Sequence, residues 1–468
     1  MDTTLDRNSG GRIASVMAEI RSRIAGRGLV PGARLPSVRA FARTMHVSTS
    51  TVVEAYERLA AEGLIRSRPG SGFYVSSPLA PLSLAEIGPK LDRAIDPLWV
   101  SRQALEDGDI LKPGCGWLPP SWMPQTAIRR ALRNLSRTED RVLSDYGTPL
   151  GSPQLRRLLT RRLGGHGISA SPDQIMLTES GTQAIDLICR FLIEPGDAVL
   201  VDDPCYFNFH ALLRAHRAKV VGVPMTPEGP DIEVFGEVLE QYKPRLYITN
   251  SAIHNPTGAT LSPVVAHRLL KLADRAGLTI VEDDIFADLE HEAAPRLAAF
   301  DGLDRVVHIG SFSKTLSASV RCGFIAARPE WIEGLVGLKI ATNFAAGRLS
   351  SELVLMLLTD GSYRKHLDGL RLRLSKAMEE ATVRLGSIGI TPWLKPQAGM
   401  FLWCRLPDRI EAADVARACL ADDIVLAPGN VFSLSQNAGS FLRFNVAQSE
   451  DPRLFRSLEK ALKLSPER

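Results

Sequence analysis

The stretch Gly310-Ser311-Phe312-Ser313-Lys314, followed by Arg321, is the most informative part of this 468-residue chain. It comes directly after Val306–Ile309, an apolar run that we predict to be a buried strand. A lysine at the end of a buried strand is desolvated, which lowers its pKa and makes its amine more reactive toward aldehydes. The Ser311 hydroxyl and the Arg321 guanidinium are suited to hold a phosphate beside that amine. By itself, the same short pattern also fits a purely structural lysine.

Short apolar runs alternate with helical stretches on both sides of this lysine. We predict strands at Ile175–Leu177, Ala198–Val201, Lys219–Val223, Leu246–Thr249, Thr279–Glu282, Val306–Ile309 and Gly323–Ala326. Strands that are separated by helices predict a parallel or mixed α/β sheet with ligands bound at the strand ends.

Three further polar clusters follow predicted strands. In the first, Ser180, Gly181 and Thr182 begin a helix, where backbone N–H groups bind anions. The second is Asn255-Pro256-Thr257-Gly258, and the third is Glu282-Asp283-Asp284. Each alone is also an ordinary cap, turn or solvated loop. The order of all four clusters along one chain indicates a single site.

In this order the clusters resemble the fold-type I enzymes of the class I aminotransferase group, over about residues 111–465. The resemblance implies an α/β domain with a mixed, mainly parallel sheet, flanking helices and a smaller C-terminal α/β subdomain. It also implies pyridoxal 5′-phosphate (PLP) as the cofactor.

The resemblance further implies roles for individual residues. Lys314 would bind the cofactor covalently and be the catalytic residue, while Asp283 would pair with the ring nitrogen and keep the ring an electron sink. Asn255 would bond the ring hydroxyl, and Tyr206 would stack on the ring. The cofactor phosphate would be held by Ser180, Gly181, Thr182, Ser311 and Arg321, with Tyr146 reaching it from a neighbouring subunit.

Arg443, in the stretch FLRFNVA, would bind an amino-acid carboxylate through two parallel hydrogen bonds. Without the resemblance, it would be interpreted as a surface arginine on an edge strand. Asp283 is preferred to Asp284 because an aromatic residue stands three residues after the essential aspartate in this group, as Phe286 does here. That aromatic is usually a tyrosine, so the missing hydroxyl puts catalytic competence in question.

The N-terminal part of the chain has the features of a winged helix. Residues 1–75 contain eleven Arg, no Lys and six acidic residues, which suits a polyanionic partner. We predict helices at residues 13–26, at Val38–Met45 and from the N-cap Ser48 to Ala61, followed by a basic hairpin in LIRSRPGSGFYV. A small structural helical cap is the competing interpretation.

Residues 12–76, which include PGARLPSVRAFARTMHVSTSTVVEAYERLAAEGLIRSRPGSGFYV, resemble the GntR family of winged-helix regulators. The resemblance implies that double-stranded DNA is contacted by Arg39, Ser48, Thr49, Ser50, Thr51, Arg66, Arg68 and Gly70. Family members often have Arg or Asn where Thr49 and Ser50 stand, so bidentate guanine recognition is unavailable there.

These features predict a three-part organisation: a DNA-binding domain at 10–78, a linker at 79–110 that includes a docking helix at 91–105, and the PLP-binding domain at 111–465. The six cysteines are scattered and are expected to be buried or free thiols, with no metal site. No apolar run is long enough to span a bilayer and the N-terminus lacks a secretory signal, so we expect a cytoplasmic location without membrane contact.

The combination of both domains resembles the MocR group of PLP-dependent regulators. It implies a homodimeric transcription regulator that senses an amino acid, an amine or a vitamin B6 compound. The alternative is a catalytically active aminotransferase with an accessory DNA-binding head. A body that has lost PLP and serves only for dimerisation is disfavoured, because the whole residue set is present.

Overall fold

The computed structural model describes residues 9–25, 29, 32–68, 71–76, 105 and 109–464. The chain divides into two compact units, Met1–Lys90 and Leu91–Arg468. Of the predictions above, Gly70 and nearly all of the docking helix at 91–105 lie outside the described residues, as does the side chain of Arg68.

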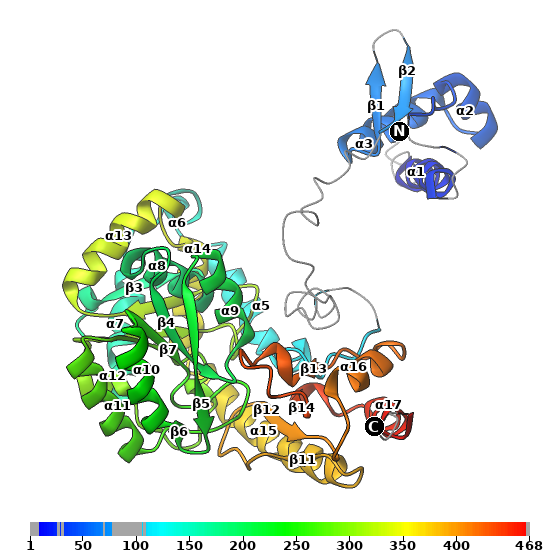
Figure 1. Cartoon of the computed structure of the whole chain (residues 1–468). Coiled ribbons are helices and arrows are strands. Elements are labelled where there is room, and N and C mark those ends of the chain that lie inside the picture. The colour runs from blue at the N-terminus through cyan, green and yellow to red at the C-terminus, as the bar shows by residue number, and fades with distance from the viewer. Residues whose placement is uncertain are drawn as a thin grey trace. The chain divides into compact units, whose positions relative to one another are not determined.

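The smaller unit consists of three helices and a hairpin (Figure 1). These are α1 (Ser9–Ala25), α2 (Val38–Met45), α3 (Thr49–Ala61), β1 (Ile65–Arg68) and β2 (Gly72–Val75). The helix starts follow from their caps, since Ser37 accepts a hydrogen bond from Ala40 N–H and Ser48 accepts one from Thr51 N–H. The predicted α2, α3 and hairpin are confirmed, whereas α1 begins earlier than predicted.

A single aromatic-rich core holds this unit together. The Tyr56 ring is fully buried, lies edge-on to Phe73 at 5.1 Å and contacts Phe41 at 6.1 Å. Its hydroxyl donates to the Pro36 carbonyl at 3.0 Å, which satisfies the polar atom of a buried tyrosine. This core fixes the angle between the helices and the hairpin.

The larger unit is built on an eight-stranded sheet in the order β3-β10-β9-β8-β7-β4-β5-β6. β9, β8, β7, β4 and β5 are parallel, whereas β10 runs antiparallel to both of its neighbours. The strands are β3 (Ile175–Thr178), β4 (Ala198–Asp203), β5 (Lys219–Thr226), β6 (Gly229–Pro230), β7 (Leu246–Thr249), β8 (Thr279–Asp283), β9 (Val306–Ser311) and β10 (Gly323–Ala326). The predicted mixed, mainly parallel sheet is confirmed.

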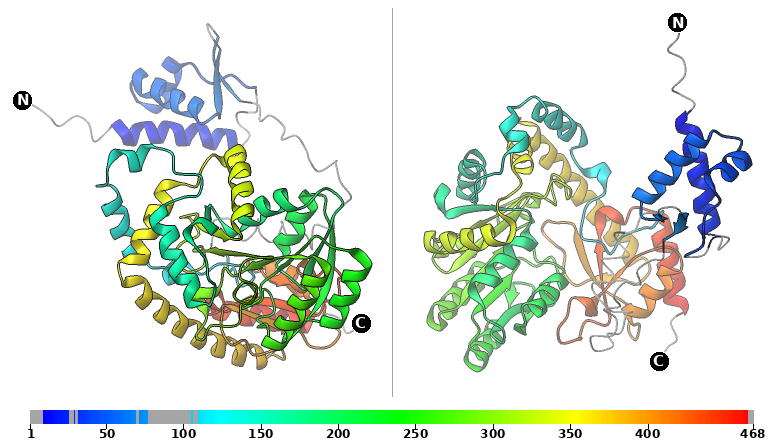
Figure 2. Two further views of the ribbon diagram at one scale, coloured as in Figure 1. Left: turned by 90° about the vertical axis from the view of Figure 1, so that its left-hand side faces the viewer. Right: turned by 90° about the horizontal axis from the view of Figure 1, so that it is seen from above.

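Helices cover both faces of this sheet (Figure 2), so successive strand residues enter different cores. Tyr247 and Ile280 pack on one side, while their neighbours Ile248 and Val281 pack on the other. The flanking helices are α5 (Gln125–Leu135), α6 (Asp140–Ser144), α7 (Pro153–Gly165), α8 (Gly181–Leu192), α9 (Phe207–Ala215), α10 (Ile232–Tyr242), α11 (Pro263–Ala276), α12 (Leu297–Asp301), α13 (Pro329–Asn343) and α14 (Arg348–Thr359).

A second, four-stranded antiparallel sheet in the order β11-β12-β14-β13 forms the predicted C-terminal subdomain. Its strands are β11 (Thr391–Pro392), β12 (Phe401–Arg405), β13 (Ala427–Pro428) and β14 (Phe441–Asn445), and its helices are α15 (Ser362–Gly386), α16 (Ala412–Leu420) and α17 (Pro452–Leu464). All six cysteines are buried and unpaired. No described helix is long and apolar enough to cross a membrane.

Candidate cofactor, ligand and DNA sites

Lys314 stands in the turn after β9 and projects into a cavity of about 430 Å³. Its amine donates to the Gly116 carbonyl at 2.6 Å. Burial, and then the positive charge of Arg443, lower the pKa of Lys314 to about 8. A lysine in this environment is a much better nucleophile near neutral pH than an exposed one.

Asp283 ends β8 and is almost fully buried beside the same cavity. Its Oδ1 accepts from Ile285 N–H at 3.3 Å, and the Asn250 amide, which donates to the Asp283 carbonyl at 2.8 Å, lies beside it. Burial nevertheless raises the pKa of Asp283 to about 7. A buried carboxylate in this environment is matched to a ligand that brings a positively charged N–H.

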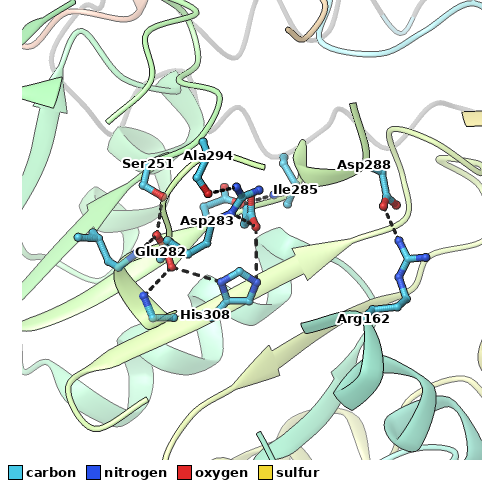
Figure 3. Close-up of polar contacts among 12 residues, drawn as sticks. Arg162, Ser251, Glu282, Asp283, Ile285, Asp288, Ala294 and His308 are labelled. Carbon is cyan, nitrogen blue, oxygen red and sulfur yellow. Dashed lines mark hydrogen bonds and ion pairs between the residues drawn. The ribbon is translucent and has the colours of Figure 1, made fainter. Parts of the chain in front are cut away.

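A network of buried charges lies next to Asp283 (Figure 3). Glu282 Oε1 accepts from Ser251 Oγ at 2.5 Å, and His308 lies between Glu282 and Asp284 at 3.4 and 3.7 Å. Arg296 joins Asp284 to Glu290, at 3.0 and 2.5 Å. Because Glu282 and Asp284 have partners on their own side of the strand, Asp283 is the member of the trio that faces the cavity.

The cavity lining also contains groups that bind anions. Ser180 caps α8 and accepts from Gln183 N–H at 3.1 Å, which leaves the Gly181 and Thr182 amides at the helix start. Ser311 and the exposed Arg321 line the same cavity. An α-helix N-terminus and an arginine together favour a phosphate dianion.

The lining residues match the chemical groups of PLP. Lys314 offers an amine for its aldehyde, Asp283 offers a buried carboxylate for its ring nitrogen, and the start of α8 offers hydrogen-bond donors for its phosphate. Tyr206 lines the same cavity. The cavity volume lies within the range of small-molecule sites, roughly 300–1,000 Å³. The structure thus brings together eight predicted residues: Ser180, Gly181, Thr182, Tyr206, Asp283, Ser311, Lys314 and Arg321.

Arg443 lies on β14 and is 1% exposed. It donates from Nη1 to Asn255 Oδ1 at 2.8 Å and from Nη2 to the Gly114 carbonyl at 2.7 Å, while its Nε has no partner. It lies over the rings of Phe401 and Phe432, at 4.3 and 4.7 Å. No carboxylate among the described residues pairs with it. Burial lowers the pKa of Arg443 to about 10, and an anionic ligand would restore it.

Asn255 and Phe286 have positions that refine the sequence predictions. Asn255 is buried against Arg443 and does not belong to the cavity lining given above. The Phe286 ring is 2% exposed, packs edge-on against Phe401 at 5.6 Å and lies 5.9 Å from the Lys314 amine. The Phe286 ring therefore stands near the lysine and offers it no hydroxyl.

Tyr146 is 78% exposed and contacts Phe344, itself 60% exposed, at 5.0 Å. It does not line the cavity of its own chain. Exposed aromatic residues that lie together are typical of a surface covered by a partner.

The predicted DNA-contacting residues that the structure describes lie at the surface of the smaller unit. Arg39 in the first turn of α2 and Arg66 on β1 are exposed, and neither has an ion-pair partner among the described residues. The Ser48 hydroxyl lies 2.8 Å from both Ser50 Oγ and Thr51 Oγ1, so these hydroxyls cluster at the start of α3, beside exposed Thr49.

Sequence reasoning missed two buried polar side chains of the body, neither of which lines the cavity. Asn445 is fully buried and donates to the carbonyls of Cys115 and Trp117, at 3.2 and 2.7 Å. Its place two residues after Arg443 on a strand, and hence on the same face, was the available signal. Lys339 is also fully buried and donates to the carbonyls of Pro149 and Leu177, at 2.5 and 2.7 Å.

Together, the winged helix and the α/β body with its lysine and carboxylate define a class of protein: a DNA-binding head on a PLP-dependent transferase fold. Comparison with known families agrees. Residues 119–460 match the family of class I and II aminotransferases, and residues 12–75 match bacterial regulatory proteins of the gntR family. The chain belongs to both families and is a MocR-type fusion of the two.

Individual relatives are of two kinds, HTH-type transcriptional regulators and aminotransferases. The uncharacterized HTH-type transcriptional regulator YdcR of Escherichia coli K12 is 30% identical over 96% of this chain and 98% of its own length. The HTH-type transcriptional regulator NorG of Staphylococcus aureus is 25% identical over 86% and 94%. LysN, the alpha-aminoadipate aminotransferase of Thermus thermophilus, was solved with N-(5′-phosphopyridoxyl)-L-leucine. It superposes with a TM-score of 0.71 at 27% identity, over 78% of this chain and 94% of that one. The cofactor of the body is pyridoxal 5′-phosphate.

Proposed function

We propose that this protein is a transcription regulator that binds DNA through its winged helix and senses an amino acid, an amine or a vitamin B6 compound through its PLP-binding body. The pairing of the two families supports this, as do relatives of similar length that are named as transcriptional regulators. We keep 10–78, 79–110 and 111–465 as the proposed boundaries of head, linker and body.

The observation that carries the proposal is the buried, carboxylate-free guanidinium of Arg443. Burying an unpaired charge is costly unless a ligand compensates it. Arg443 and Lys314 donate to the carbonyls of Gly114 and Gly116, at 2.7 and 2.6 Å, so the two cationic groups lie close together. A ligand that carries both an amine and a carboxylate satisfies them together.

When bound, PLP supplies an aldehyde that captures primary amines and a ring that withdraws electrons from them. The Asp283 carboxylate would accept a hydrogen bond from the ring N–H, and the groups at the start of α8, with Ser311 and Arg321, would hold the phosphate. The Lys314 amine would take or return a proton at the ligand's α-carbon. Arg443 would orient the ligand carboxylate, while Phe401 and Phe432 exclude water from it.

On the DNA side, we propose that the start of α3 enters the major groove while the hairpin and α2 contact phosphates. The residues concerned are Arg39, Ser48, Thr49, Ser50, Thr51, Arg66, Arg68 and Gly70. We also propose a homodimer in which Tyr146 reaches the cofactor phosphate of the neighbouring subunit, which its exposure allows. Because residues 12–75 match bacterial regulatory proteins, we propose that the protein works in the cytoplasm.

The second candidate is a working aminotransferase with an accessory head. Its specific support is that Lys314 and Asp283 flank one cavity in a body similar to LysN. Phe286 weakens this candidate, because no hydroxyl at that position can bond the cofactor oxygen.

A panel of amino acids and amines separates the two candidates. Each compound is added to the full-length PLP-loaded protein while the cofactor absorption and the affinity for promoter DNA are recorded. The regulator hypothesis requires a compound that changes both. Turnover without any change in DNA affinity would favour the enzyme.

A further inference from the structure

Asp203, the last residue of β4, joins the main sheet to the C-terminal subdomain. Its Oδ1 accepts a hydrogen bond from Leu434 N–H at 3.1 Å, and its Oδ2 accepts one from Ser435 N–H at 3.0 Å. Two residues further along the chain, Cys205 N–H donates to the Phe432 carbonyl at 2.9 Å. We call these three hydrogen bonds the clasp. It holds together two segments that lie far apart in the sequence.

The clasp uses a carboxylate that neither the sheet nor the cofactor cavity uses. The preceding residue, Asp202, is fully buried and accepts from the hydroxyls of Tyr247 and Thr249, at 2.5 and 2.7 Å. Successive side chains of a strand point to opposite faces, so Asp203 is turned away from this network. Asp203 is partly exposed and does not line the cofactor cavity. Any effect of Asp203 on a ligand is therefore exerted through the residues that the clasp holds.

On the side of the main sheet, the clasp fixes the turn that carries Tyr206. A Cβ atom on Gly222 of β5 would lie 3.0 Å from Asp203 Cβ, so the Asp203 side chain lies closely against β5. Cys205 Sγ lies 3.0 Å from His210 Nε2. Burial lowers the pKa of His210 to about 4 and raises the pKa of the Cys205 thiol, so this contact joins two neutral groups at pH 7. Tyr206, which lines the cofactor cavity, thus stands in a firmly held turn.

On the side of the subdomain, the clasp fixes the ring that lies against Arg443. Phe432 is fully buried, and its ring lies 4.7 Å from the Arg443 guanidinium. It packs edge-on against Trp403 of the same subdomain at 5.6 Å and against Phe207 of α9 at 5.5 Å. Phe207 directly follows Tyr206 in the chain. The hydrogen bonds of the clasp and this aromatic contact therefore hold the same two segments together.

We propose that Asp203 is a positioning residue for carboxylate recognition, because the clasp sets the separation between the cofactor at Tyr206 and the guanidinium of Arg443. This role rests on the proposed function, in which one ligand reaches both groups. A single carbon joins the amine of an α-amino acid to its carboxylate, so such a ligand cannot adapt to a changed separation. Binding groups that are held in place before the ligand arrives also reduce the entropic cost of binding it.

Two probes that differ only in a carboxylate isolate this effect. They are N-(5′-phosphopyridoxyl)-L-leucine and its decarboxylated counterpart, N-(5′-phosphopyridoxyl)-3-methylbutylamine. Neither carries an aldehyde, so both bind non-covalently to the full-length protein after PLP has been removed. Hydrogen bonds to charged groups are among the stronger ones, so we expect the wild-type protein to prefer the carboxylate probe by about tenfold or more.

The test variant is Asp203→Ala, which removes both acceptors of the clasp. We expect its preference for the carboxylate probe to fall below about threefold, because Arg443 is no longer held in register with the cofactor. The matched control is Asp231→Ala, because Asp231 also accepts from two backbone N–H groups, those of Glu233 and Val234, at the start of α10. A general loss of stability should appear in both variants, whereas the control should keep the wild-type preference.

Asp203→Asn is the second variant, because it keeps the shape of the side chain and one acceptor oxygen. Its preference should lie between those of the wild type and Asp203→Ala. A wild-type preference in either folded variant, including equal weakening of both probes, would overturn the role of Asp203 and leave the proposed function intact. A wild-type protein that does not distinguish the probes would show that Arg443 does not bind the carboxylate, and the role of Asp203 would fall with it. If neither probe binds the wild-type protein, the proposed function itself is wrong.

Discussion

The Arg443 guanidinium donates from Nη1 to Asn255 Oδ1 at 2.8 Å, across 188 residues of sequence. The bond joins the C-terminal subdomain to the loop that follows β7, so each of the two segments fixes the other. It holds the guanidinium plane while Nε remains unpaired. Arg443 is thereby oriented before any ligand arrives, which reduces the entropic cost of binding one.

Replacing Arg443 by Gln should weaken binding of carboxylate-bearing amines selectively. Hydrogen bonds to charged groups contribute about 1.5–3 kcal/mol each, so the loss should be on the order of 10- to 100-fold. Spectral titration with an amino acid and with its decarboxylated amine measures this loss. Equal weakening of both ligands would show that Arg443 does not bind the carboxylate.

Lys314 should make PLP uptake depend on pH. The pKa of Lys314 is lowered to about 8, and only the neutral amine attacks an aldehyde. The rate at which stripped protein takes up PLP should therefore rise about tenfold per pH unit below pH 8 and level off above it. Stopped-flow absorption gives the profile.

A control variant tests the cause of that profile. Arg443→Gln removes a positive charge that lowers the pKa of Lys314, so the midpoint should move upward. A wild-type midpoint near that of an exposed lysine would contradict the buried environment of the amine.

Asp283→Asn should have opposite effects on the stripped and the loaded protein. Burial raises the pKa of Asp283 to about 7, so the folded state binds this proton more tightly than the unfolded state does. The carboxylate therefore costs stability as pH rises from about 4 through 7, and this cost is fully present above pH 7. At pH 8 the stripped variant should be more stable, by about 1–3 kcal/mol, and PLP affinity should fall.

Thermal unfolding of both forms, with a PLP titration, measures the two effects. A variant that is less stable without PLP would mean that Asp283 serves the fold instead of the cofactor.

The sequence predicted the cofactor side of the site well, because those residues stand at the ends of strands that are short, apolar and clearly bounded. Leu246–Thr249 and Gly323–Ala326 were predicted with the bounds that the structure has. In a mainly parallel sheet such ends meet at one edge, so Ser180, Asp283 and Lys314 were expected to come together.

The remaining features depend on contacts between distant segments, which no local pattern encodes. Asn445 meets Cys115 across 330 residues, and Lys339 meets Leu177 across 162. The burial of Arg443 follows from Phe401 and Phe432, which arrive from elsewhere in the C-terminal subdomain. From the local pattern alone, Arg443 was predicted to be a surface arginine on an edge strand.

Arg39→Ala and Arg66→Ala should each weaken DNA binding and reduce its salt dependence. If each residue contacts one phosphate, the slope of log affinity against log salt should become shallower by about 1 per substitution. Fluorescence anisotropy across several salt concentrations gives the slope. Arg58→Ala is the matched control, because Arg58 is exposed on α3 but paired with Glu54 at 2.6 Å. Wild-type slopes in both test variants would contradict the proposed DNA surface.

The most direct test of a ligand-sensing regulator records the state of the cofactor and the binding of DNA at the same time. Labelled promoter DNA is titrated with full-length PLP-loaded protein in the presence of each amine, while anisotropy and the visible absorption band are followed in one sample. We predict that at least one amine changes the band and shifts the DNA affinity by about fivefold or more, and that Lys314→Ala abolishes both responses. Amines that change the band in wild-type protein but never alter its DNA affinity would contradict the account.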